Sequence, residues 1–514
     1  MLIKILMLVV FFGVMIAVGL YCRKNATDVS GFVLGGRSVG PWLTAFAFGT
    51  SYFSAVVFVG YAGQFGWKYG IAATWAGIGN ALIGSLAAWA VLGRRTRIMT
   101  QHLDSATMPE FFGKRFGSGG LKICASIIAF IFLIPYTASL YNGLSRLFGM
   151  AFNMDYTICI IIMAVLTGIY VIAGGYMATA INDFIQGIVM LIGICAVIGA
   201  VLSAQGGLMG ALTGLSMITD ETVSDMPGVF NSFLGPDPIN LLGVVILTSL
   251  GTWGLPQMVQ KFYAIKSEDS VKKGTIISTI FAFIVAGGCY FLGGFGRLFS
   301  DKIDVAAEGY DAIIPTMLSS LPDLLIAVVV VLVLSASMST LSSLVLTSSS
   351  TITIDLIKDN IVKDMDEKKQ VFIMRVFVVV FIVISAVIAI FQYKKGATFI
   401  AQLMGVSWGA LAGAFLAPFL YGLYWKKTTK IACYVNFVFA TVVMILNMII
   451  RPMFPKLLQS PINAGAFTMI AGLIIVPVVS LLTPAPDKEL VEESFKCYDE
   501  KVLVSKKRAL EDGE

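Results

Sequence analysis

Charged residues are scarce in this chain. They make up 13% of its 514 residues, whereas soluble proteins contain about 25%. Hydrophobic residues make up 57%, and the mean hydropathy is +0.87. This composition excludes a water-soluble globular enzyme. Apolar runs of about 20 residues, long enough for one helix to cross a bilayer, recur along nearly the whole chain. The sequence therefore predicts an all-α membrane protein with the lipid bilayer as its surroundings.

Histidine and paired cysteines are lacking as well. His102 is the only histidine, and it lies in a basic stretch near Asp104, where we expect it to be solvated rather than to relay protons. The seven cysteines are odd in number and scattered, and no CxxC pair occurs. These absences argue against a disulfide scaffold and against a zinc or haem site. No paired carboxylates lie within the apolar stretches, so we expect neither an enzyme active site nor an organic cofactor.

Apolar stretches between charge clusters predict about thirteen transmembrane helices. They lie at 3–22, 42–64, 71–93, 121–148, 155–173, 181–203, 238–262, 274–298, 324–354, 372–392, 398–424, 429–450 and 461–483. The first stretch lacks a small-residue cleavage site before Arg23 and Lys24, so we expect a transmembrane helix rather than a signal peptide. Residues 1–483 would form one transmembrane domain, and residues 484–514 a short cytosolic tail.

Lysine and arginine gather at or near the loops after the odd-numbered spans, and those at the end of the seventh span or beyond it include Lys261 and Lys266. Cytoplasmic loops retain positive charge, so the N-terminus is predicted outside and the C-terminus in the cytoplasm, in a multi-pass plasma (inner) membrane protein. Two loops on the opposite side are acidic. They carry Asp220, Glu221, Asp225 and Asp237, and Asp301, Asp304, Glu308 and Asp311. The net charge of +6 thus reflects topology and not nucleic-acid binding.

Two spans contain a Gly-Thr step near their middle. The second span has Gly49-Thr50 and the seventh has Gly251-Thr252, followed closely by Pro256. The two steps lie five spans apart, as in a five-plus-five inverted repeat whose halves each begin with a broken helix that faces a solute. The core repeats would cover about 42–203 and 238–424. Glycine and proline also serve as packing residues in transmembrane helices, but the matched pair favours breaks.

The ninth span is rich in hydroxyl groups, with ten between Ser335 and Ser350 and no charge among them. Ala336, Ser339, Thr340 and Ser343 share one helical face, because they follow the spacing i, i+3, i+4, i+7. A small hard cation such as Na⁺ prefers oxygen ligands, which hydroxyls and unwound carbonyls supply without burying full charges. The alternative is that the hydroxyls only bond carbonyls of the preceding turn.

Asp183 is the only charged residue between Asp155 and Asp220. An ionisable group at the edge of an otherwise uncharged span is a functional candidate. An acid at a helix N-terminus can also be stabilised by the helix dipole alone. The sequence leaves both interpretations open.

Four stretches of the chain carry a resemblance to a known family. They are Gly35-Gly-Arg37-Ser-Val-Gly40-Pro, the Gly174-Gly-Tyr stretch that continues to Asn182-Asp183 and Gln186-Gly, Met338-Ser339-Thr340-Leu-Ser342, and Arg146-Leu-Phe. Together they resemble the sodium/solute symporter family, which includes the proline and pantothenate symporters. The resemblance extends from the first span to about residue 483. It implies a leucine-transporter (LeuT-type) inverted repeat with an extra N-terminal helix. It also implies sodium-coupled import of a small solute by alternating access.

The resemblance also implies site residues. A first sodium ion would be held by Thr50, Phe53, Ala336, Ser339 and Thr340, and a second by Asp183, Ser339, Ser342 and Ser343. The solute would lie near Ser54, Ala55, Val57, Tyr136, Thr248, Thr252 and Trp253.

The solute itself is less well defined by the resemblance. Proline-transporting members carry aromatic residues at the places of Thr248 and Thr252, and sugar-transporting members carry glutamine at that of Val57, so both assignments are weakened. The stretch from Asn182 and the sequence Gly254-Leu-Pro256 look most like the pantothenate branch. The expected solute is a small organic acid or amino acid. Proton coupling through Asp183 is the alternative to sodium, and a solute sensor is a further one.

Overall fold

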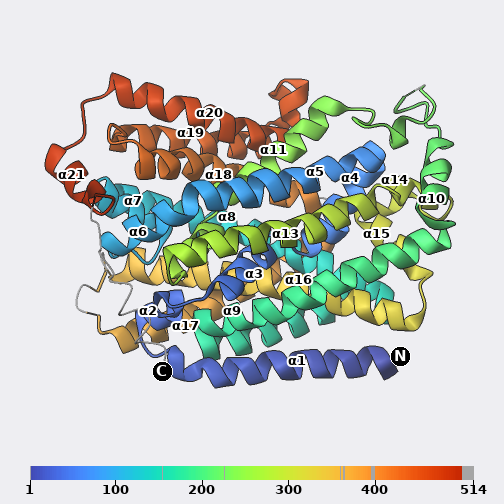
Figure 1. Cartoon of the computed structure of the whole chain (residues 1–514), viewed down its shortest axis with the longest axis horizontal. Coiled ribbons are helices and arrows are strands. Elements are labelled where there is room, and N and C mark those ends of the chain that lie inside the picture. Colours follow the sequence, from blue (N-terminus) through green and yellow to red (C-terminus); the bar gives the residue numbers. More distant parts are fainter. Residues whose placement is uncertain are drawn as a thin grey trace.

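The computed structural model describes residues 2–152, 154–224, 226–358, 361–362, 365–394 and 400–499. Asp225 and the end of the tail from residue 500 lie outside the described residues. Within these ranges the chain is helical and forms no strand, only isolated bridges between Val39 and Ile265 and between Asp220 and Ser224. Long helices run side by side through one bundle (Figure 1).

The longest helices are α1 (Leu2–Cys22), α8 (Gly119–Phe152), α9 (Tyr156–Ala204), α13 (Glu268–Gly293), α16 (Asp323–Ser350), α17 (Glu367–Lys394), α18 (Ile400–Tyr424), α19 (Lys430–Ile449) and α20 (Pro461–Leu482). Two further spans are broken: α3 (Pro41–Tyr52) is followed by α4 (Ala62–Tyr69), and α11 (Pro238–Gly254) by α12 (Pro256–Ala264). The shorter helices are α2 (Val29–Leu34), α5 (Thr74–Gly79), α6 (Arg94–His102), α7 (Met108–Arg115), α10 (Gly207–Ser216), α14 (Val305–Glu308), α15 (Ile313–Ser319) and α21 (Lys488–Lys496).

In the described part of the chain, ten helices are long and apolar enough to cross a membrane, or eleven if the bent pair α11 and α12 is one span. The thirteen predicted stretches fall on helices, but not all of these helices are full spans. Helix α3 has only 12 residues before its break, and the predicted span 155–173 contributes the short apolar helix Tyr156–Ile169. At Gly175, φ is 56° and ψ is −148°, so α9 contains a sharp break between two predicted spans.

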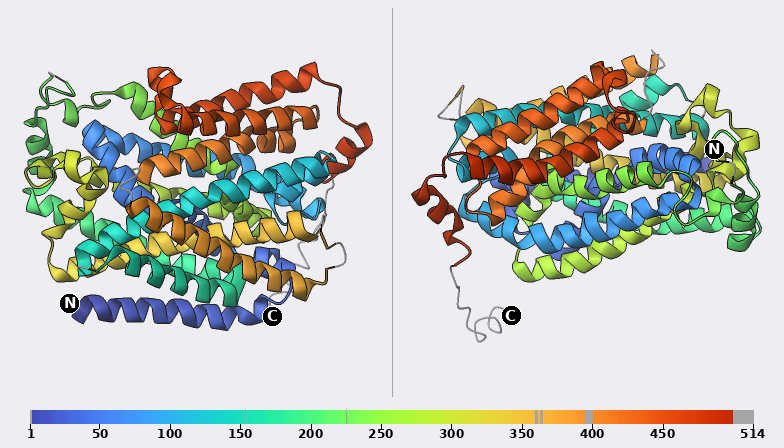
Figure 2. Two further views of the ribbon diagram at one scale, coloured as in Figure 1. Left: turned by 180° about the vertical axis from the view of Figure 1, so that it is seen from behind. Right: turned by 90° about the horizontal axis from the view of Figure 1, so that it is seen from above.

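Helix α16 lies in the interior of the bundle. All its residues from Val329 to Ser350 are buried, and it packs against α8, α9, α17 and α3. Helix α1 lies on the outside, against α9 and α16, whereas α19 and α20 lie on the far side of the bundle, packed against α18 (Figures 1 and 2). The hydroxyl-rich segment is therefore enclosed by protein and not exposed to lipid.

The two ends of the bundle differ in charge. Helices α10, α14 and α15 lie at the end where the chain begins, and α2, α6, α7 and α21 lie at the opposite end (Figure 1). The first end includes the acidic loops, and the second includes the basic residues of α6 and α7. Lys261 departs from this pattern, because α12 continues to Ala264 and leaves the lysine only 2% exposed inside the bundle. Lys261, which the sequence placed at or near the loop after the seventh span, therefore lies inside the bundle.

The first part of the tail packs against the basic end. Helix α21 contacts α6 and α7, and the Tyr498 hydroxyl donates a hydrogen bond to the Arg95 carbonyl oxygen at 3.1 Å. His102 lies 3.5 Å from the carboxylate of Glu493 and 2.8 Å from that residue's carbonyl oxygen. His102 is thus partly covered by the tail and not freely solvated.

Glycines allow close packing of α4 against α13. A Cβ atom on Gly66 would lie 1.9 Å from the carbonyl oxygen of Gly293, and one on Gly293 would lie 2.1 Å from that of Ala62. Both neighbours are backbone atoms, which cannot rotate away. Small residues are a common means of close helix packing in membranes.

We expect Gly66→Ala to destabilise the protein. The added methyl would force α4 and α13 apart, and overpacking of this kind costs about 1–3 kcal/mol. Melting of the detergent-purified protein should occur several degrees lower than in the native chain. Gly199→Ala is the matched control, since a Cβ there meets nothing within 4 Å. An equal melting temperature for both variants would contradict the close packing.

Asp311 is a buried acid at the acidic end. It is 6% exposed, and its Oδ2 accepts a hydrogen bond of 3.3 Å from the Ile400 amide at the start of α18. Burial raises the pKa of Asp311 to about 6, although the Ile400 hydrogen bond and the charge of Arg146 oppose the shift. Because the pKa of Asp311 is higher in the folded than in the unfolded state, the contribution of this residue to the free energy of unfolding is greatest in acid. That contribution is lost as the pH rises through about 6.

Asp311→Asn should therefore raise the melting temperature at pH 7.5, since the amide keeps an acceptor for Ile400 without burying a charge. The gain should be at most about 3 kcal/mol at this pH. Near pH 4.5 most of the difference should disappear, because the native carboxyl is then protonated. Asp301→Asn, at an exposed residue of the same end, is the control and should change little. A difference independent of pH would show that Asp311 does not titrate in this window.

Candidate functional site

The second predicted span is broken at residues 53–55. Helix α3 ends at Tyr52, and Phe53 has extended backbone angles of φ −87° and ψ 118°. Beyond the break the chain continues as a π-helical segment, Val56–Tyr61. The Ser337 hydroxyl accepts a hydrogen bond of 3.1 Å from the free Ala55 amide. Because the helix is interrupted here, the last carbonyl groups of α3 lack the backbone amide partners that a continuous helix would provide.

The break lies a few residues beyond the Gly49-Thr50 step that predicted it. Gly49 is a packing glycine: a Cβ there would lie 2.4 Å from the ring of Phe281. Gly251 has the same role, since its Cβ would lie 2.5 Å from the Trp408 ring. Both spans were predicted correctly as broken, but the glycines mark helix contacts and not the breaks themselves.

The seventh predicted span is broken at Leu255, where α11 and α12 meet at an angle of 46°. Leu255 is extended, with φ −79° and ψ 122°. The following residue, Pro256, lacks an amide hydrogen and disfavours helical angles in the residue before it. The proline therefore explains the position of this break.

Five oxygen atoms meet between the α3 break and α16. The Ser339 hydroxyl oxygen lies 3.1 Å from the carbonyl oxygen of Thr50 and 3.0 Å from that of Ala336. The Thr340 hydroxyl oxygen lies 3.1 Å from the Thr50 carbonyl oxygen, 3.3 Å from that of Phe53 and 3.0 Å from that of Ala336. All five residues are buried. We call this group the oxygen cage.

The dimensions of the oxygen cage suit a small hard cation. Sodium has nearly the radius of calcium, whose oxygen ligands lie at about 2.3–2.6 Å. Ligands at right angles around such an ion are therefore separated by roughly 3.3–3.7 Å. The cage distances of 3.0–3.3 Å would need to lengthen by only a few tenths of an ångström. The donor set consists of neutral oxygens, which disfavours transition metals.

Five of the remaining hydroxyls of α16 have one of two kinds of partner. Those of Ser342, Ser349 and Ser350 donate to carbonyls of their own helix at 2.9–3.0 Å, which is the alternative that the sequence left open. That of Thr347 instead donates to Gln260 Oε1 on α12 at 2.7 Å. The Ser343 hydroxyl contacts α3 and α12. One side of α16 is therefore joined by hydrogen bonds to both broken helices.

Asp183 and Lys261 lie next to this side of α16. The Lys261 ammonium donates to the Ser343 hydroxyl oxygen at 2.9 Å and lies 3.7 Å from Asp183 Oδ2. The Ser343 hydroxyl also lies 2.9 Å from the Ser51 hydroxyl of α3. Asp183 is 0% exposed, so it is not an acid at a solvated helix terminus. We call Asp183, Lys261, Ser51 and Ser343 the charged cluster.

The other residues of these motifs position helices. The Asn182 side chain donates to the Met15 carbonyl oxygen at 3.4 Å and thereby contacts α1. Arg37 donates to the carbonyl oxygens of Thr100, Ser105 and Tyr263 at 2.7–3.2 Å. These bonds join the segment before α3 to α6, to the residues just after α6 and to α12.

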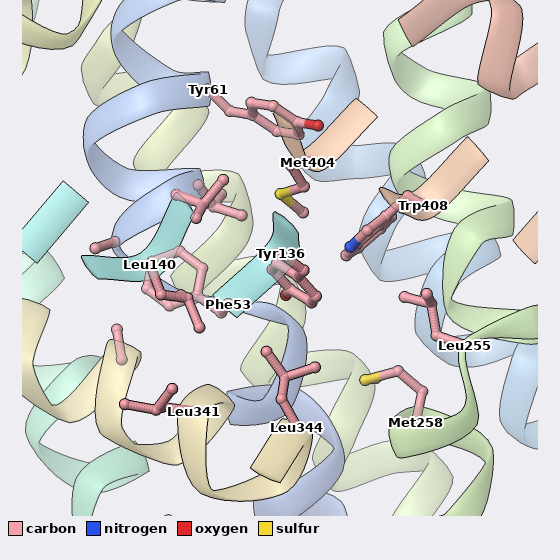
Figure 3. Close-up of a cluster of buried hydrophobic side chains, with 14 of the residues drawn as sticks. Phe53, Tyr61, Tyr136, Leu140, Leu255, Met258, Leu341, Leu344, Met404 and Trp408 are labelled. Carbon is pink, nitrogen blue, oxygen red and sulfur yellow. The ribbon is translucent and has the colours of Figure 1, made fainter. Parts of the chain in front are cut away.

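A cluster of buried, mostly apolar side chains lies next to the α3 break (Figure 3). Its labelled members come from the α3 break and the segment after it, from the α11 break and α12, and from α8, α16 and α18. They are Phe53, Tyr61, Tyr136, Leu140, Leu255, Met258, Leu341, Leu344, Met404 and Trp408. The Tyr136 and Trp408 rings pack edge to face with their centroids 5.9 Å apart. We call this group the central cluster.

The predicted solute residues divide into two groups. Ser54, Ala55 and Val57 are buried at the α3 break, and Tyr136 belongs to the central cluster. The residues of α11 bond elsewhere: the Thr248 hydroxyl donates to the Val244 carbonyl oxygen, that of Thr252 to Gly84, and the Trp253 indole nitrogen to Ile83. The latter two therefore point towards the neighbouring segment of residues 80–87.

Sequence reasoning missed the contribution of Leu255, Met258, Met404 and Trp408 to the central cluster. Two of them flank the α11 break, so Pro256 could have pointed to them. Trp408 lies against Gly251, and a glycine opposite a large ring is a contact that one sequence does not reveal.

At the acidic end, a polar cavity of about 600 Å³ is lined by residues that include Lys68, Asp220, Asp237 and Arg297. Arg297 donates to Asp220 Oδ2 at 2.8 Å and to the Trp67 carbonyl oxygen at 2.6 Å. Hydrogen bonds from Thr222 and Arg297 lower the pKa of Asp220. The cavity thus has charged walls at the acidic end of the bundle.

A sequence profile of the sodium:solute symporter family matches residues 32–435. The chain belongs to the sodium:solute symporter family. It is accordingly a multi-pass membrane protein that couples the movement of a small solute to that of Na⁺.

Relatives of this chain match it nearly end to end. It is 30% identical over 498 residues to a sodium/proline symporter of Staphylococcus aureus (strain JH9), and the alignment covers 94% of this chain and 93% of that protein. It is 27% identical over 509 residues to an osmoregulated proline transporter of Bacillus subtilis (strain 168), covering 98% and 99%. Among solved structures, it is similar to a Na⁺-coupled sialic acid symporter in a substrate-bound outward-open state, with a TM-score of 0.72, 16% identity and coverage of 95% and 99%. This similarity shows a shared fold.

Proposed function

We propose that the oxygen cage binds the coupling sodium ion and that the solute binds beside it in the central cluster. The convergence of five buried oxygens at the α3 break carries this proposal, because a broken helix exposes carbonyls that an uncharged helix face can complement with hydroxyls. Thr50, Phe53, Ala336, Ser339 and Thr340 would be its ligands. No organic cofactor is needed, and transport is the activity of the protein.

The proposed architecture is an inverted repeat of the leucine-transporter type. Helices α3 and α11 would begin its two halves, since both are broken at comparable points, and α1 would be an extra leading helix. The thirteen predicted spans fit this arrangement. We place the basic end, with the tail, in the cytoplasm and the N-terminus outside the plasma membrane, in agreement with the distribution of lysine and arginine.

Sodium would couple to the solute through the helices that it joins. An ion in the oxygen cage holds the end of α3 against α16, and the same break carries Ser54 and Ala55 next to the central cluster. Stabilising the break therefore stabilises the solute site. The coupling must be reciprocal, so sodium and solute raise each other's affinity by the same factor.

A small amino acid or organic acid fits the central cluster best. Proline is the first candidate, because the two named relatives carry proline and the cluster combines apolar surface with the Tyr136 hydroxyl. The differences from proline transporters at Thr248 and Thr252 concern hydroxyls bonded to Val244 and Gly84. They therefore weigh less against proline than the sequence suggested.

Thermal-shift screening in sodium and in potassium tests the solute. Ligand binding raises the melting temperature according to its affinity, so proline should stabilise the purified protein more in sodium than in potassium. Pantothenate and other small acids and amino acids form the comparison set. If another compound gives the larger sodium-dependent shift, that compound replaces proline as the solute.

Ser339→Ala and Thr340→Ala should each weaken sodium activation of uptake by proteoliposomes. Each removes an oxygen ligand, and the loss of a bond to a charged partner costs about 1.5–3 kcal/mol, or roughly 10–100-fold in the half-saturating sodium concentration. Ser349→Ala is the control, because that buried hydroxyl bonds only to its own helix at Leu346. Unchanged sodium activation in both cage variants would exclude this site. Uptake that follows a pH gradient without sodium, and is abolished in Asp183→Asn, would favour proton coupling instead.

Met258→Ala should raise the half-saturating concentration of the transported solute several-fold, since this side chain faces the central cluster (Figure 3). Trp253→Phe should leave it nearly unchanged, because the Trp253 indole bonds to Ile83 on the neighbouring segment. Initial uptake rates at saturating sodium distinguish the two variants. If Trp253→Phe instead raised the half-saturating solute concentration more than Met258→Ala, Trp253 would belong to the solute site and Met258 would not.

A further inference from the structure

Lys261 is a fully enclosed cation in the charged cluster. Its side chain is 3% exposed, and its ammonium contacts the Ser343 hydroxyl at 2.9 Å and Asp183 Oδ2 at 3.7 Å. The ammonium also lies 5.1 Å from the centre of the Tyr176 ring, whose face is electron-rich. The lysine is thus surrounded by groups that favour a positive charge.

Helix α12 holds Lys261 in this place. Gln260, the preceding residue, accepts a hydrogen bond from Thr347 of α16 and donates one to the Val33 carbonyl oxygen of α2. The helix therefore has little freedom to withdraw the ammonium towards the basic end. Burying an ammonium in a membrane-spanning bundle is unfavourable unless it is paired, and Asp183 supplies the opposite charge.

The ammonium occupies the position that a second sodium ion would require. Asp183 and Ser343 belong to the second candidate set, and both face Lys261. The other two members are otherwise engaged: Ser342 donates to the Ser339 carbonyl oxygen, and the Ser339 hydroxyl belongs to the oxygen cage. A sodium ion bound to the same carboxylate and hydroxyl would lie within a few ångströms of the ammonium, and the repulsion between these two positive charges disfavours its binding.

We propose that the Lys261 ammonium is a tethered cation that replaces a second sodium ion, so that one sodium ion accompanies each solute molecule. This proposal rests on the proposed function, in which the oxygen cage binds the coupling sodium. A tethered charge remains with the protein through the transport cycle. Lys261 thus compensates Asp183 permanently and adds nothing to the driving force taken from the sodium gradient.

Equilibrium binding of ²²Na⁺ to the purified protein, with sodium-to-solute ratios in proteoliposomes, tests the proposal. The native chain should bind one sodium ion per monomer with a Hill coefficient near 1. Lys261→Ala should free Asp183 and the Ser343 hydroxyl, raising the number to two and the coefficient towards 2. Lys261→Arg keeps the charge and should stay at one. The double variant Asp183→Asn with Lys261→Ala should return to one, since the carboxylate is gone.

Two sodium ions per native monomer would overturn the proposal, and so would a folded Lys261→Ala protein that still binds one. If Lys261→Ala does not fold, the native stoichiometry alone decides. These outcomes can be distinguished from failure of the proposed function. If the proposed function is wrong, the native protein will bind no sodium, or Ser339→Ala and Thr340→Ala will leave the amount of bound sodium unchanged.

Discussion

The contact between the interrupted end of α3 and the hydroxyl face of α16 is the interaction on which the site depends. A membrane interior provides no water for the free carbonyls of a broken helix, so they must find partners within the protein. The hydroxyls of Ser339 and Thr340 lie within 3.1 Å of the Thr50 carbonyl oxygen, and the Ser337 hydroxyl satisfies the Ala55 amide on the other side of the break. Hydroxyl groups can pair with these carbonyls, and because they are neutral no charge has to be desolvated. The same arrangement leaves a set of oxygens that a sodium ion can use.

The rest of the bundle holds this contact in place. Glycines permit close approach where it is needed, as at Gly49 beside Phe281 and Gly251 beside Trp408. Arg37 bonds to carbonyls of α6 and of α12, and so secures the segment before α3. Each of these features restricts the position of a broken helix relative to its neighbours. The break is therefore a fixed structural element and not a loosely folded region.

Most of the architecture could be predicted from the sequence because hydrophobicity acts over whole spans. The helical bundle, the two broken spans and the shared face of Ser339 and Thr340 all follow from composition and helical periodicity. The exact break positions could not be predicted, because a glycine has the same appearance whether it packs or interrupts a helix. The candidate sodium ligands were inferred from the family resemblance, and in the structure their five oxygens lie together as the oxygen cage. Whether they hold sodium remains a prediction.

The sequence was least informative where a helix changes direction. The rotation of α11 around its axis decides which side chains face the centre, and nothing in the order of residues fixes that rotation. Thr252 and Trp253 accordingly point towards a neighbouring segment, whereas Met258, one turn after the break, faces the central cluster. Lys261 was expected at or near a cytoplasmic loop because it lies at the end of an apolar run and precedes further lysines. Its burial depends on α12 extending past it, which is a property of the three-dimensional packing.

Hydrogen–deuterium exchange at the α3 break, compared in sodium and in potassium, tests the central claim most directly. Exchange of an amide measures how often its local structure opens. If sodium joins the end of α3 to α16, the amides of Ala55 to Val57 and those of Ala336 to Thr340 should exchange more slowly in sodium, while α19 and α20 remain unaffected. Equal exchange in the two salts at these amides would contradict the account.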